Sequence, residues 1–528
     1  MYARAPIMTT EALHPSGASG AAFSTKSPVD GTPLSDVTGT SPDAVAAIVA
    51  RARGAQGAWG ETSAQGRAKL VRQVKDRVLD RAVKIAECVK REVGKPEVEA
   101  LLGEVLPTAD VVTYWADAIE ELLEGVEVEL DRTAYPGKTG VIHRDARGVV
   151  ALITPWNFPV ALPLRTIVPA LLAGNAVVWK PSEISPRSGA LVAELFDGLL
   201  PPGVFEIVQG GADVGVALCR ADVDLVVFTG SVASGRKVAH ACAERLIPCS
   251  LELGGKDAAI VLADANLDRA ANGIVWGAMM NCGQNCAAVE RVYVERAVAE
   301  AFIERVTTAV KALKPGDDIG PLTTEAQRAT VRRHVDAAKA AGATVVTGGE
   351  DGAAGYAYLP TVVRVDSDEL DLIREETFGP VLPIAIIDNA EEGLARANAS
   401  RFGLTASIWT KDLRRGEALA RKLRAGVVTI NNHSFTGALP AAPWSGHGES
   451  GYGITNSPLA LEALTRPRFL LVDKSGGKRE LWWYPYTPGL TTIALAMAQL
   501  RSGTTGIFAR VSALFTLLVA LPKRMFGG

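Results

Sequence analysis

The pattern of hydrophobic and polar residues changes character near Gly148. From Ser41 to about Gly125, apolar positions recur with helical spacing among many charged residues, as in SPDAVAAIVARARGAQGAWG, which predicts a series of helices. Two following stretches, VEVEL and TGVIHRDARG, alternate like exposed strands and predict a hairpin.

Beyond Gly148, short apolar runs alternate with helical stretches. The first runs are VVALIT, AVVWK, VFEIVQ and LVVFTG, and a second series comprises AAIVL, RVYVE, ATVVTGG, PVLPIAII, TASIWT and GVVTINN. Apolar runs of this length separated by helices are typical of buried parallel strands. The sequence therefore predicts two α/β domains.

Composition narrows the class of protein. The 528 residues exceed one ordinary core, and 48% hydrophobic with 21% charged residues indicates a well-buried globular chain. The net charge of −3 gives no global attraction to nucleic acid, and no nucleic-acid partner is expected. Six scattered cysteines without a C-x-x-C pair favour a reducing compartment. We expect a cytoplasmic protein without a signal peptide or membrane-spanning helix, and a disordered N-terminus over residues 1–23.

The C-terminal segment differs from the rest of the chain. From Leu481 onward it contains no Asp or Glu, but it carries LWWYPY, VSALFTLLVAL and four basic residues, Arg501, Arg510, Lys523 and Arg524. One interpretation is an interfacial segment that holds the protein at an anionic membrane. The alternatives are packing on a neighbouring subunit or disorder.

Two motifs in the first α/β series suit a dinucleotide. FTGSVASG, Phe228–Gly235, ends a strand at a Gly-Ser turn and opens a helix whose N-terminus would offer N–H groups to a phosphate. In WKPSE, Lys180 and Glu183 follow the second strand, where an acidic residue commonly meets a ribose diol. Taken singly, a plain strand–helix turn explains the first motif equally well, and a solvated charge pair explains the second better. Both motifs in one βαβ run favour a dinucleotide.

Two further motifs carry polar groups suited to catalysis. TPWNFP places Asn157 just beyond the strand Val149–Thr154, where it is either a turn former or an amide donor to a developing oxyanion. LELGGKDAAIVL places Glu252 in an apolar run before two glycines. A carboxylate there either pairs with a cation or is a base with a shifted pKa.

The stretch MNCGQNC contains two cysteines, and we assign them different roles. The chain lacks the nearby ligands that a zinc site needs, and no metal is expected. A buried structural cysteine is the commonest fate of a thiol, and we assign it to Cys282. Cys286 follows a flexible Gly-Gln approach, and with a candidate base and oxyanion donor elsewhere in the chain it is interpreted as a nucleophile.

Together these motifs resemble those of the aldehyde dehydrogenase superfamily, over roughly Ser24 to Pro485. TPWNFP, AGNAVVWKPSE, FTGSVASG, LELGGKDAAIV, NCGQNC and EETFGPVLPI occur in the family's order. Glu252 and Cys286 are 286 − 252 = 34 residues apart, a separation typical of the family. MNCGQNC, RPRFLLV and the basic, apolar tail are most similar to the fatty-aldehyde branch.

The resemblance implies a fold and a division into domains. The implied fold is α/β, with a Rossmann-like cofactor domain, an α/β catalytic domain and a small β oligomerisation flap. The expected boundaries are residues 24–125 and 148–254 for the NAD-binding domain, 255–450 for the catalytic domain, 126–147 and 466–485 for the flap, and 486–528 for the tail. A homo-oligomer, dimer or tetramer, is expected.

The resemblance also implies a mechanism. Cys286 would attack the aldehyde, Asn157 and the backbone N–H of Cys286 would hold the oxyanion, and Glu252 would activate water to hydrolyse the thioester. NAD is the expected cofactor, with NADP as the alternative, because Glu183 should repel a 2′-phosphate while Lys180 and Ser182 soften that preference. The implied cofactor-binding residues are Thr154, Pro155, Trp156, Lys180, Ser182, Glu183, Gly210, Gly230, Ser231, Gly235, Leu253, Glu376 and Phe378.

The expected substrate is a medium- or long-chain aliphatic aldehyde, with succinate semialdehyde or another short polar aldehyde as the alternative. Glu252 argues against a CoA-acylating dehydrogenase, which usually lacks that carboxylate. A cysteine hydrolase would need a basic partner for its thiol, and no histidine lies near Cys286 in the sequence. A non-catalytic binding protein would tolerate loss of Cys286, Asn157 or Glu252, yet all three are present.

Overall fold

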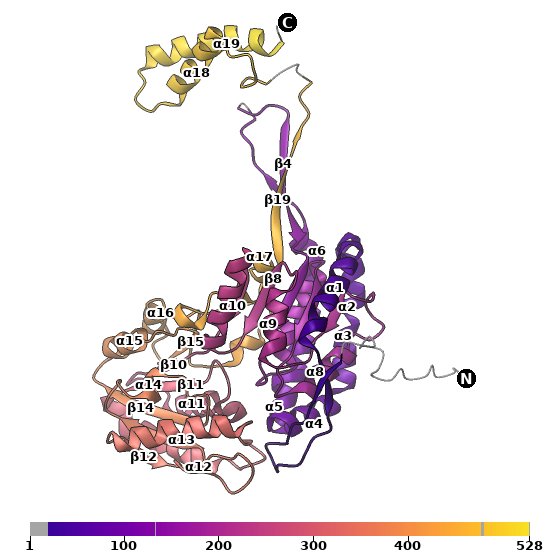
Figure 1. Ribbon diagram of the computed structural model, residues 1–528. Coiled ribbons are helices and arrows are strands. Elements are labelled where there is room, and N and C mark those ends of the chain that lie inside the picture. The colour runs from indigo at the N-terminus through magenta and orange to yellow at the C-terminus, as the bar shows by residue number, and fades with distance from the viewer. Residues whose placement is uncertain (1–18, 133, 477–479, 527–528) are drawn as a thin grey trace. The chain divides into compact units, whose positions relative to one another are not determined.

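The strand–helix alternation beyond Gly148 produces two mainly parallel sheets in the computed structural model (Figure 1). The structure describes residues 19–132, 134–476 and 480–526. Their contacts divide the chain into two units, one containing the chain up to Glu124 with Arg144–Arg466, and the other Gly125–His143 with the chain from Pro467. The α/β fold class predicted from the sequence is confirmed.

The first sheet has five parallel strands in the order β7-β6-β5-β8-β9. The strands are β5 (Val149–Ile153), β6 (Ala176–Lys180), β7 (Phe205–Ile207), β8 (Leu225–Thr229) and β9 (Cys249–Glu252), and the intervening helices are α7 (Ala161–Leu172), α8 (Pro186–Glu194), α9 (Ala212–Arg220) and α10 (Val232–Arg245). The strand order reverses at β5. In open parallel sheets a ligand binds at the carboxyl ends of the strands beside such a switch point.

Alternation along β5 explains why this sheet is covered on both faces. Val150 and Leu152 enter a core shared with α7, whereas Val149, Ala151 and Ile153 enter a second core shared with α10. Successive side chains of a strand point to opposite faces, so a continuous apolar run serves two cores at once.

The second sheet has seven strands in the order β12-β13-β14-β11-β10-β15-β16, parallel except where β12 meets β13. The strands are β10 (Asp257–Val261), β11 (Val289–Glu295), β12 (Thr344–Thr347), β13 (Thr361–Val365), β14 (Val381–Ile387), β15 (Thr405–Trp409) and β16 (Val427–Ile430). Its helices are α11 (Leu267–Met279), α12 (Ala299–Ala312), α13 (Glu325–Ala340), α14 (Asp371–Arg374), α15 (Ala390–Asn398) and α16 (Leu413–Ala420). The sequence analysis predicted neither β13 nor β9. Both contain polar residues that interrupt the apolar pattern, Ser250 in β9 and Arg364 in β13.

The N-terminal part forms the predicted helical layer. The helices are α1 (Val45–Glu61), α2 (Ala64–Val71), α3 (Gln73–Asp80), α4 (Ala82–Val93), α5 (Glu97–Ala100) and α6 (Leu106–Leu123), with a π-helical turn over Leu101–Val105. One expectation is corrected here. Ser19–Phe23, assigned to a disordered terminus, form strand β1 because they pair antiparallel with β2 (Val37–Thr40). Residues 1–18 lie outside the described part.

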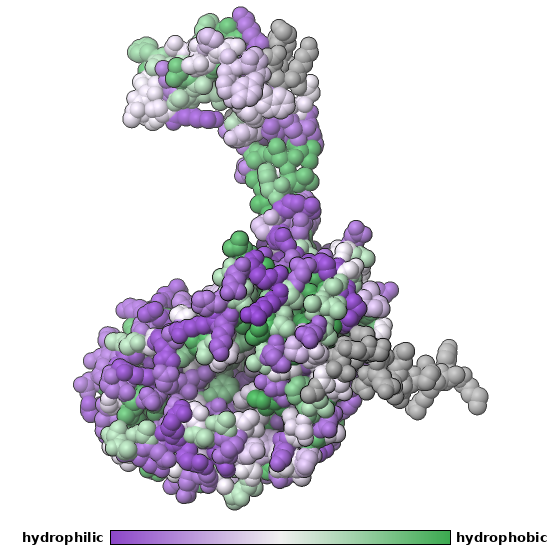
Figure 2. Space-filling model, in the orientation of Figure 1, coloured by the Kyte–Doolittle hydropathy of each residue, from purple (hydrophilic) through white to green (hydrophobic). Residues whose placement is uncertain are grey.

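The second unit contains a three-stranded sheet in the order β19-β4-β3, made from β3 (Val126–Val128), β4 (Lys138–Ala146) and β19 (Thr465–Asp473). These segments were predicted to form the flap, and its role in oligomerisation stays a prediction. Two helices, α18 (Pro488–Arg501) and α19 (Ile507–Phe526), follow and pack on each other. Hydrophobic side chains lie on the surface of this unit, including Phe469 to Val472 (Figure 2). No helix among the described residues is long and apolar enough to span a bilayer.

Candidate active site

A small cavity of ≈ 20 Å³ brings together the predicted nucleophile and the predicted base. Cys286 lies on the loop before β11, and Glu252 is the last residue of β9. The cavity is lined by Leu162, Arg165, Thr166, Thr229, Glu252, Leu253, Cys286, Leu404, Trp444 and Thr455. These residues come from segments spread over nearly three hundred positions, and only the fold makes them neighbours. We call this cavity the catalytic pocket.

The loop before Cys286 has an unusual backbone that requires particular residues. Asn281, Cys282 and Gly283 follow one another with φ values of 53°, 56° and 71°, in the left-handed region. A Cβ on Gly283 would collide with the carbonyl oxygen of Gly379, so only glycine fits there. The Glu99 carboxylate accepts the Asn281 N–H at 3.0 Å and thereby fixes the start of the loop. The buried Cys282 supports the interpretation of that thiol as structural.

Asn157 is tied directly to this loop. Its side-chain amide donates to the carbonyl oxygen of Gln284 at 3.1 Å, and the Asn281 amide donates to the carbonyl oxygen of Asn157 at 3.0 Å. Gln284 is two residues before Cys286, so the two predicted catalytic segments are held as one assembly. An amide nitrogen carries two N–H groups. The Gln284 carbonyl oxygen accepts one of these N–H groups, and no other described residue accepts a hydrogen bond from the Asn157 side-chain nitrogen.

A buried ion pair positions the helix that follows Asn157, and the sequence analysis did not identify it. Lys95 Nζ lies 2.5 Å from Glu104 Oε1, with both side chains almost fully buried. The other oxygen of Glu104 accepts the N–H groups of Val160 and Ala161 at 3.2 and 2.8 Å, which caps the start of α7. Lys95 also lies 3.8 Å from the ring centre of Phe158. A Lys and a Glu nine positions apart in a helical region gave no sign of this role.

Burial dominates the electrostatics of the catalytic pocket. It raises the pKa of the Cys286 thiol to about 12, with smaller contributions from Asp257 and Glu376, while Arg165 acts in the opposite direction. Burial also raises the pKa of Glu252 well above its usual value, and Arg165 again opposes the shift. Neither carboxyl oxygen of Glu252 has a hydrogen-bond partner among the described residues. Such a carboxyl keeps its proton to a higher pH than an exposed glutamate does.

A second cavity, the cofactor cleft, has a volume of ≈ 590 Å³ at the carboxyl ends of β5, β6 and β8. Of the predicted cofactor-binding residues, it is lined by Thr154, Pro155, Lys180, Ser182, Glu183, Gly230 and Ser231. Ser231 caps α10 by accepting the Ser234 N–H. Lys180 Nζ lies 3.2 Å from Glu183, and burial lowers the pKa of Lys180. Thr229 lines both cavities, so the cleft adjoins the catalytic pocket.

The remaining predicted cofactor residues lie outside the lining of the cleft. Gly210 and Gly235 make room for close packing, because a Cβ there would meet Val214 and Leu253 respectively. Leu253 lines the catalytic pocket instead.

The residues of EETFGPV and TPWNFP meet next to the Cys286 loop. Phe378 packs edge-on against Trp156 with ring centres 5.8 Å apart. Glu376 accepts the Gly255 N–H at 3.1 Å, and burial raises the pKa of its carboxyl to about 8.

The cleft also contains charged residues that the sequence analysis missed. Arg220, Lys237, His240 and Glu244 lie on α9 and α10 and line it. The sequence feature that could have identified three of them is the helical spacing of Lys237, His240 and Glu244, which puts all three on one face of α10. Arg165 in the catalytic pocket was missed as well, although it is the lone charge in the apolar stretch ALPLRTIVPALL.

Comparison with known proteins agrees with this geometry. A model of the aldehyde dehydrogenase family matches residues 15–470, and the chain belongs to this family of aldehyde oxidoreductases. It is 36% identical to a 4,4'-diapolycopene aldehyde oxidase from Methylomonas over 466 residues, covering 87% of this chain and 88% of that protein.

Solved structures give the same result. An NAD-dependent aldehyde dehydrogenase from Sinorhizobium meliloti is 34% identical, with a TM-score of 0.84 over 88% of this chain and 93% of the other. PnpE, solved in complex with nicotinamide adenine dinucleotide, is 33% identical, with a TM-score of 0.83 over 86% and 94%. The fold is therefore the aldehyde dehydrogenase fold.

Proposed function

We propose that this chain oxidises an aldehyde to a carboxylate with NAD, through a covalent intermediate on Cys286. The observation that carries the proposal is that Cys286 and Glu252 line one pocket, and that this pocket adjoins the cofactor cleft at Thr229. A nucleophile, a base and a dinucleotide-sized cleft in contact are what such a reaction requires.

Each catalytic residue has a role that its surroundings suit. The Cys286 thiol loses its proton to solvent and the resulting thiolate attacks the carbonyl carbon. The oxyanion is held by the Asn157 amide together with the backbone N–H of Cys286. After oxidation the acyl group is a thioester on Cys286. Glu252 takes a proton from the water that attacks this thioester, and the carboxylate product leaves. The unpartnered carboxyl oxygens of Glu252 leave it free to do so.

The cofactor cleft suits NAD in shape and in chemistry. Lys180 and Glu183 would hold the adenosine ribose, and the start of α10 at Ser231 would face the pyrophosphate. When bound, NAD accepts the hydride from the substrate carbon. Glu183 favours NAD over NADP by repelling a 2′-phosphate. Lys180, Ser182 and the cationic Lys237 keep NADP as the alternative.

Two classes of aldehyde are candidates for the substrate. A medium- or long-chain aliphatic aldehyde, as in the fatty-aldehyde branch, is supported by RPRFLLV and the apolar tail. A short polar aldehyde such as succinate semialdehyde is the second candidate, because the pocket beside Cys286 is narrow and lined by polar groups including Thr166 and Thr455.

The decisive experiment is NADH formation by the purified chain across an aldehyde series from acetaldehyde to hexadecanal, with succinic semialdehyde and benzaldehyde included. A kcat/KM that rises with chain length supports the fatty-aldehyde substrate. A maximum at succinic semialdehyde supports the short polar class. If no aldehyde in the series yields NADH above the level of a Cys286→Ser control, the proposed function is wrong.

We further propose that the sheet of the second unit mediates homo-oligomerisation and that α19 contacts an anionic membrane. Seven apolar residues of α19 are exposed at helical spacing, namely Ile507, Phe508, Val511, Leu514, Phe515, Leu518 and Val519. Lys523 and Arg524 in its last turn add positive charge.

Truncation after Pro488 tests the membrane contact. Removing this segment should release the protein from vesicles containing phosphatidylserine without abolishing turnover of short aldehydes. Unchanged co-sedimentation would contradict the membrane contact, and a change of oligomeric state instead would show that α19 packs on a second subunit.

A further inference from the structure

Two cysteines lie outside both cavities, where α10 is joined to β9. Cys242 is near the end of α10, and Cys249 is the first residue of β9. The chain turns sharply between them, because Leu246 ends the helix with a φ of 55° and the Ile247 N–H donates to the Cys242 carbonyl oxygen at 3.1 Å. Cys242 lies in the hydrophobic core on this face of the sheet, and Cys249 packs against that core. The turn therefore brings the two thiols together, and the Cys242 side chain forms a hydrogen bond with Cys249.

Cys249 has the surroundings of a reactive thiol. Its side chain is half-buried, and its sulfur lies 3.0 Å from the hydroxyl of Tyr452, which is 61% exposed. Hydrogen bonds from Cys242 and Tyr452 lower the pKa of Cys249 although burial opposes them, while the pKa of Cys242 is raised by its hydrogen bond to Cys249. A thiolate within reach of solvent and next to a protonated thiol can react with an oxidant and then close to a disulfide.

The other thiols differ from Cys249 in their electrostatics. Cys88 is also half-buried and faces a hydroxyl, that of Ser188 at 3.7 Å, but burial raises the pKa of Cys88 to about 12. Burial likewise raises the pKa of Cys219 to about 11 and that of Cys286 to about 12. Of the six cysteines, all of which the structure describes, Cys249 alone has a lowered pKa. The thiol that oxidises first should therefore be Cys249 rather than the nucleophile.

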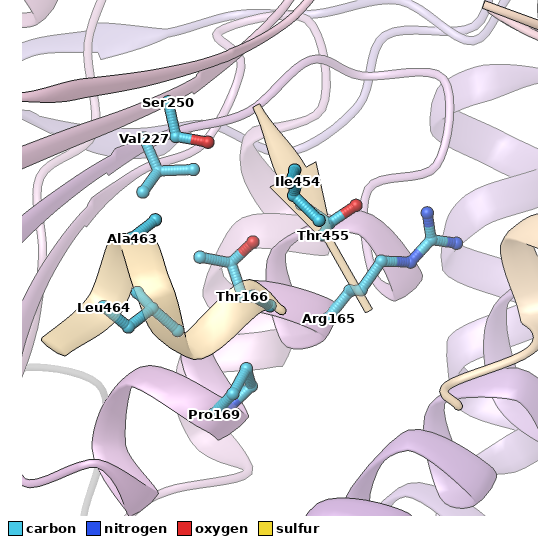
Figure 3. Close-up of a pocket in the computed structure, with 10 residues that line it drawn as sticks. Arg165, Thr166, Pro169, Val227, Ser250, Ile454, Thr455, Ala463 and Leu464 are labelled. Atoms are coloured by element: carbon cyan, nitrogen blue, oxygen red, sulfur yellow. The ribbon is translucent and has the colours of Figure 1, made fainter. Parts of the chain in front are cut away.

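Strand β9 connects this cysteine pair to the catalytic region. Successive side chains of a strand point to opposite faces. Cys249 and Leu251 lie against the core beside α10, whereas Ser250 and Glu252 each line a cavity on the other side. Figure 3 shows Ser250 at its cavity, together with Thr166 of α7. A displacement of β9 at Cys249 is thus carried to Glu252, the last residue of the same four-residue strand.

The segment around Tyr452 covers the outer edge of β9. β9 is the last strand of its sheet, and the N–H groups of Tyr452 and Gly453 donate to the Leu251 carbonyl oxygen at 3.1 and 2.9 Å. The contact between Cys249 and the Tyr452 hydroxyl adds a side-chain link to this edge. Drawing the Cys249 sulfur toward α10 removes that link close to Glu252.

We propose that Cys249 and Cys242 form a reversible disulfide when the protein meets a peroxide, and that this disulfide slows turnover. The Cys249 thiolate attacks a peroxide oxygen, the O–O bond breaks, and hydroxide leaves and takes up a proton, so that a sulfenic acid and water result. The Cys242 sulfur then attacks the sulfenic sulfur, the S–S bond forms, the S–O bond breaks, and a second water leaves with the Cys242 proton. Two thiols are oxidised and one peroxide is reduced to two waters. The slowing of turnover rests on the proposed function, whereas the disulfide does not.

The test follows thiols and turnover side by side. The full chain is reduced, freed of reductant and treated with hydrogen peroxide at neutral pH. The proteins are wild type, Cys249→Ser, Cys242→Ala and, as a matched control, Cys88→Ser, which removes the other half-buried thiol that faces a hydroxyl. Peptide mapping by mass spectrometry after alkylation measures each thiol and the disulfide, and NADH formation is measured before and after dithiothreitol. NAD titration and thermal unfolding of the untreated variants verify the fold.

In wild type, the disulfide between Cys242 and Cys249 should form at least about tenfold faster than Cys286 or Cys88 is oxidised, because the thiolate is the reacting form. Turnover should fall in proportion to the disulfide and should return with dithiothreitol. Cys249→Ser should form no such disulfide and should keep its turnover under the same treatment.

The other two variants separate the steps. Cys242→Ala should stop at the sulfenic acid of Cys249, which dimedone traps, and should pass slowly to the sulfinic acid that dithiothreitol does not reverse. Cys88→Ser should behave as wild type does, with the same rate of disulfide formation and the same loss and recovery of turnover.

Three observations would count against the inference. Oxidation of Cys286 or Cys88 before Cys249 would contradict the choice of thiol, and pairing of Cys249 with any cysteine other than Cys242 would contradict the choice of partner. Complete disulfide formation with unchanged turnover would contradict the effect on Glu252. A reduced wild-type protein that oxidises no aldehyde would instead contradict the proposed function, and peptide mapping would still decide whether the disulfide forms.

Discussion

The cofactor cleft and the catalytic pocket adjoin each other, yet they are built in opposite ways. The cleft is wide, ≈ 590 Å³, and its lining comes from consecutive strand–helix units of one sheet between Ile153 and Glu244. The catalytic pocket is ≈ 20 Å³, and its lining extends from Leu162 to Thr455. A binding surface made by the ends of neighbouring strands follows from local sequence. A reaction pocket made where several segments converge follows only from their packing.

The two regions also differ in electrostatics. In the cleft, the charged groups are paired or reach solvent, as Lys180 and Glu183 do. In the pocket, neither carboxyl oxygen of Glu252 has a partner among the described residues, and burial raises the pKa of both Glu252 and Cys286. The charged groups of the cleft are thus already paired or hydrated, whereas the Glu252 carboxyl in the pocket lacks hydrogen-bond partners that a substrate or a water molecule could supply.

The largest expected effect separates binding from chemistry. Cys286→Ser should lower aldehyde oxidation by at least about 10,000-fold, because a serine hydroxyl in this pocket is a far weaker nucleophile. NAD binding, measured by calorimetry, should stay within about threefold of wild type. Cys282→Ser is the matched control and should retain activity, since that thiol only fills space. Activity near the wild-type level in Cys286→Ser would show that the pocket containing Cys286 is not where the reaction takes place.

The next effect concerns the base. Glu252→Gln should lower steady-state turnover roughly 100- to 10,000-fold, while a burst of about one NADH per active site persists, because only thioester hydrolysis needs the carboxylate. Rapid-mixing absorbance measures the burst. Loss of the burst together with turnover would show that Glu252 acts before hydrolysis.

The raised pKa of Glu252 also predicts how stability and turnover depend on pH. Burial raises the pKa of Glu252 in the folded protein, so its folded form holds the proton more tightly than the unfolded chain does. Stability from this group is complete below the ordinary pKa of 4.5 and is lost as pH rises toward the raised value. Wild-type turnover should accordingly rise with pH as the base form appears. Glu252→Gln should gain thermal stability over wild type in alkaline solution.

A smaller effect tests the cleft. Glu183→Gln should change the ratio of kcat/KM for NAD over NADP by about tenfold toward NADP, because one repulsive charge and one ribose acceptor are lost. Activity at saturating NAD should be little affected. An unchanged ratio would mean that other residues, with Lys237 the first candidate, set the cofactor preference.

The smallest expected effect compares two thiols in the NAD-free protein. Cys249 lies 3.0 Å from the Tyr452 hydroxyl, and hydrogen bonds from Cys242 and Tyr452 lower its pKa to about 6. At pH 7, iodoacetamide should therefore label Cys249 faster than Cys286, whose pKa is raised to about 12. Peptide mapping by mass spectrometry gives the two rates. Faster labelling of Cys286 would show that the reactive site is already activated without cofactor.

Much of the fold could be predicted because the strands carry strong local patterns. The runs that form β5, β6, β8 and β14 are continuous, apolar and bounded by turns, and they appear where expected. β9 and β13 were missed because polar residues such as Ser250 and Arg364 interrupt their apolar pattern, so these strands depend more on their neighbours in the sheet. The strand at Ser19–Phe23 was missed for the same reason, since its pairing partner is separated from it by a loop.

The sequence by itself predicted the parallel sheets and marked Cys286, Glu252 and Asn157 as candidates, because strand patterns and motifs depend on residue type and local spacing. Only the tertiary structure decided that Asn157 is tied to the Cys286 loop, that Glu104 is paired with Lys95 and caps α7, and that Arg165 lines the same cavity as Cys286. Whether a charge inside a protein is paired depends on which distant segments converge on it, and no local pattern along the chain records that.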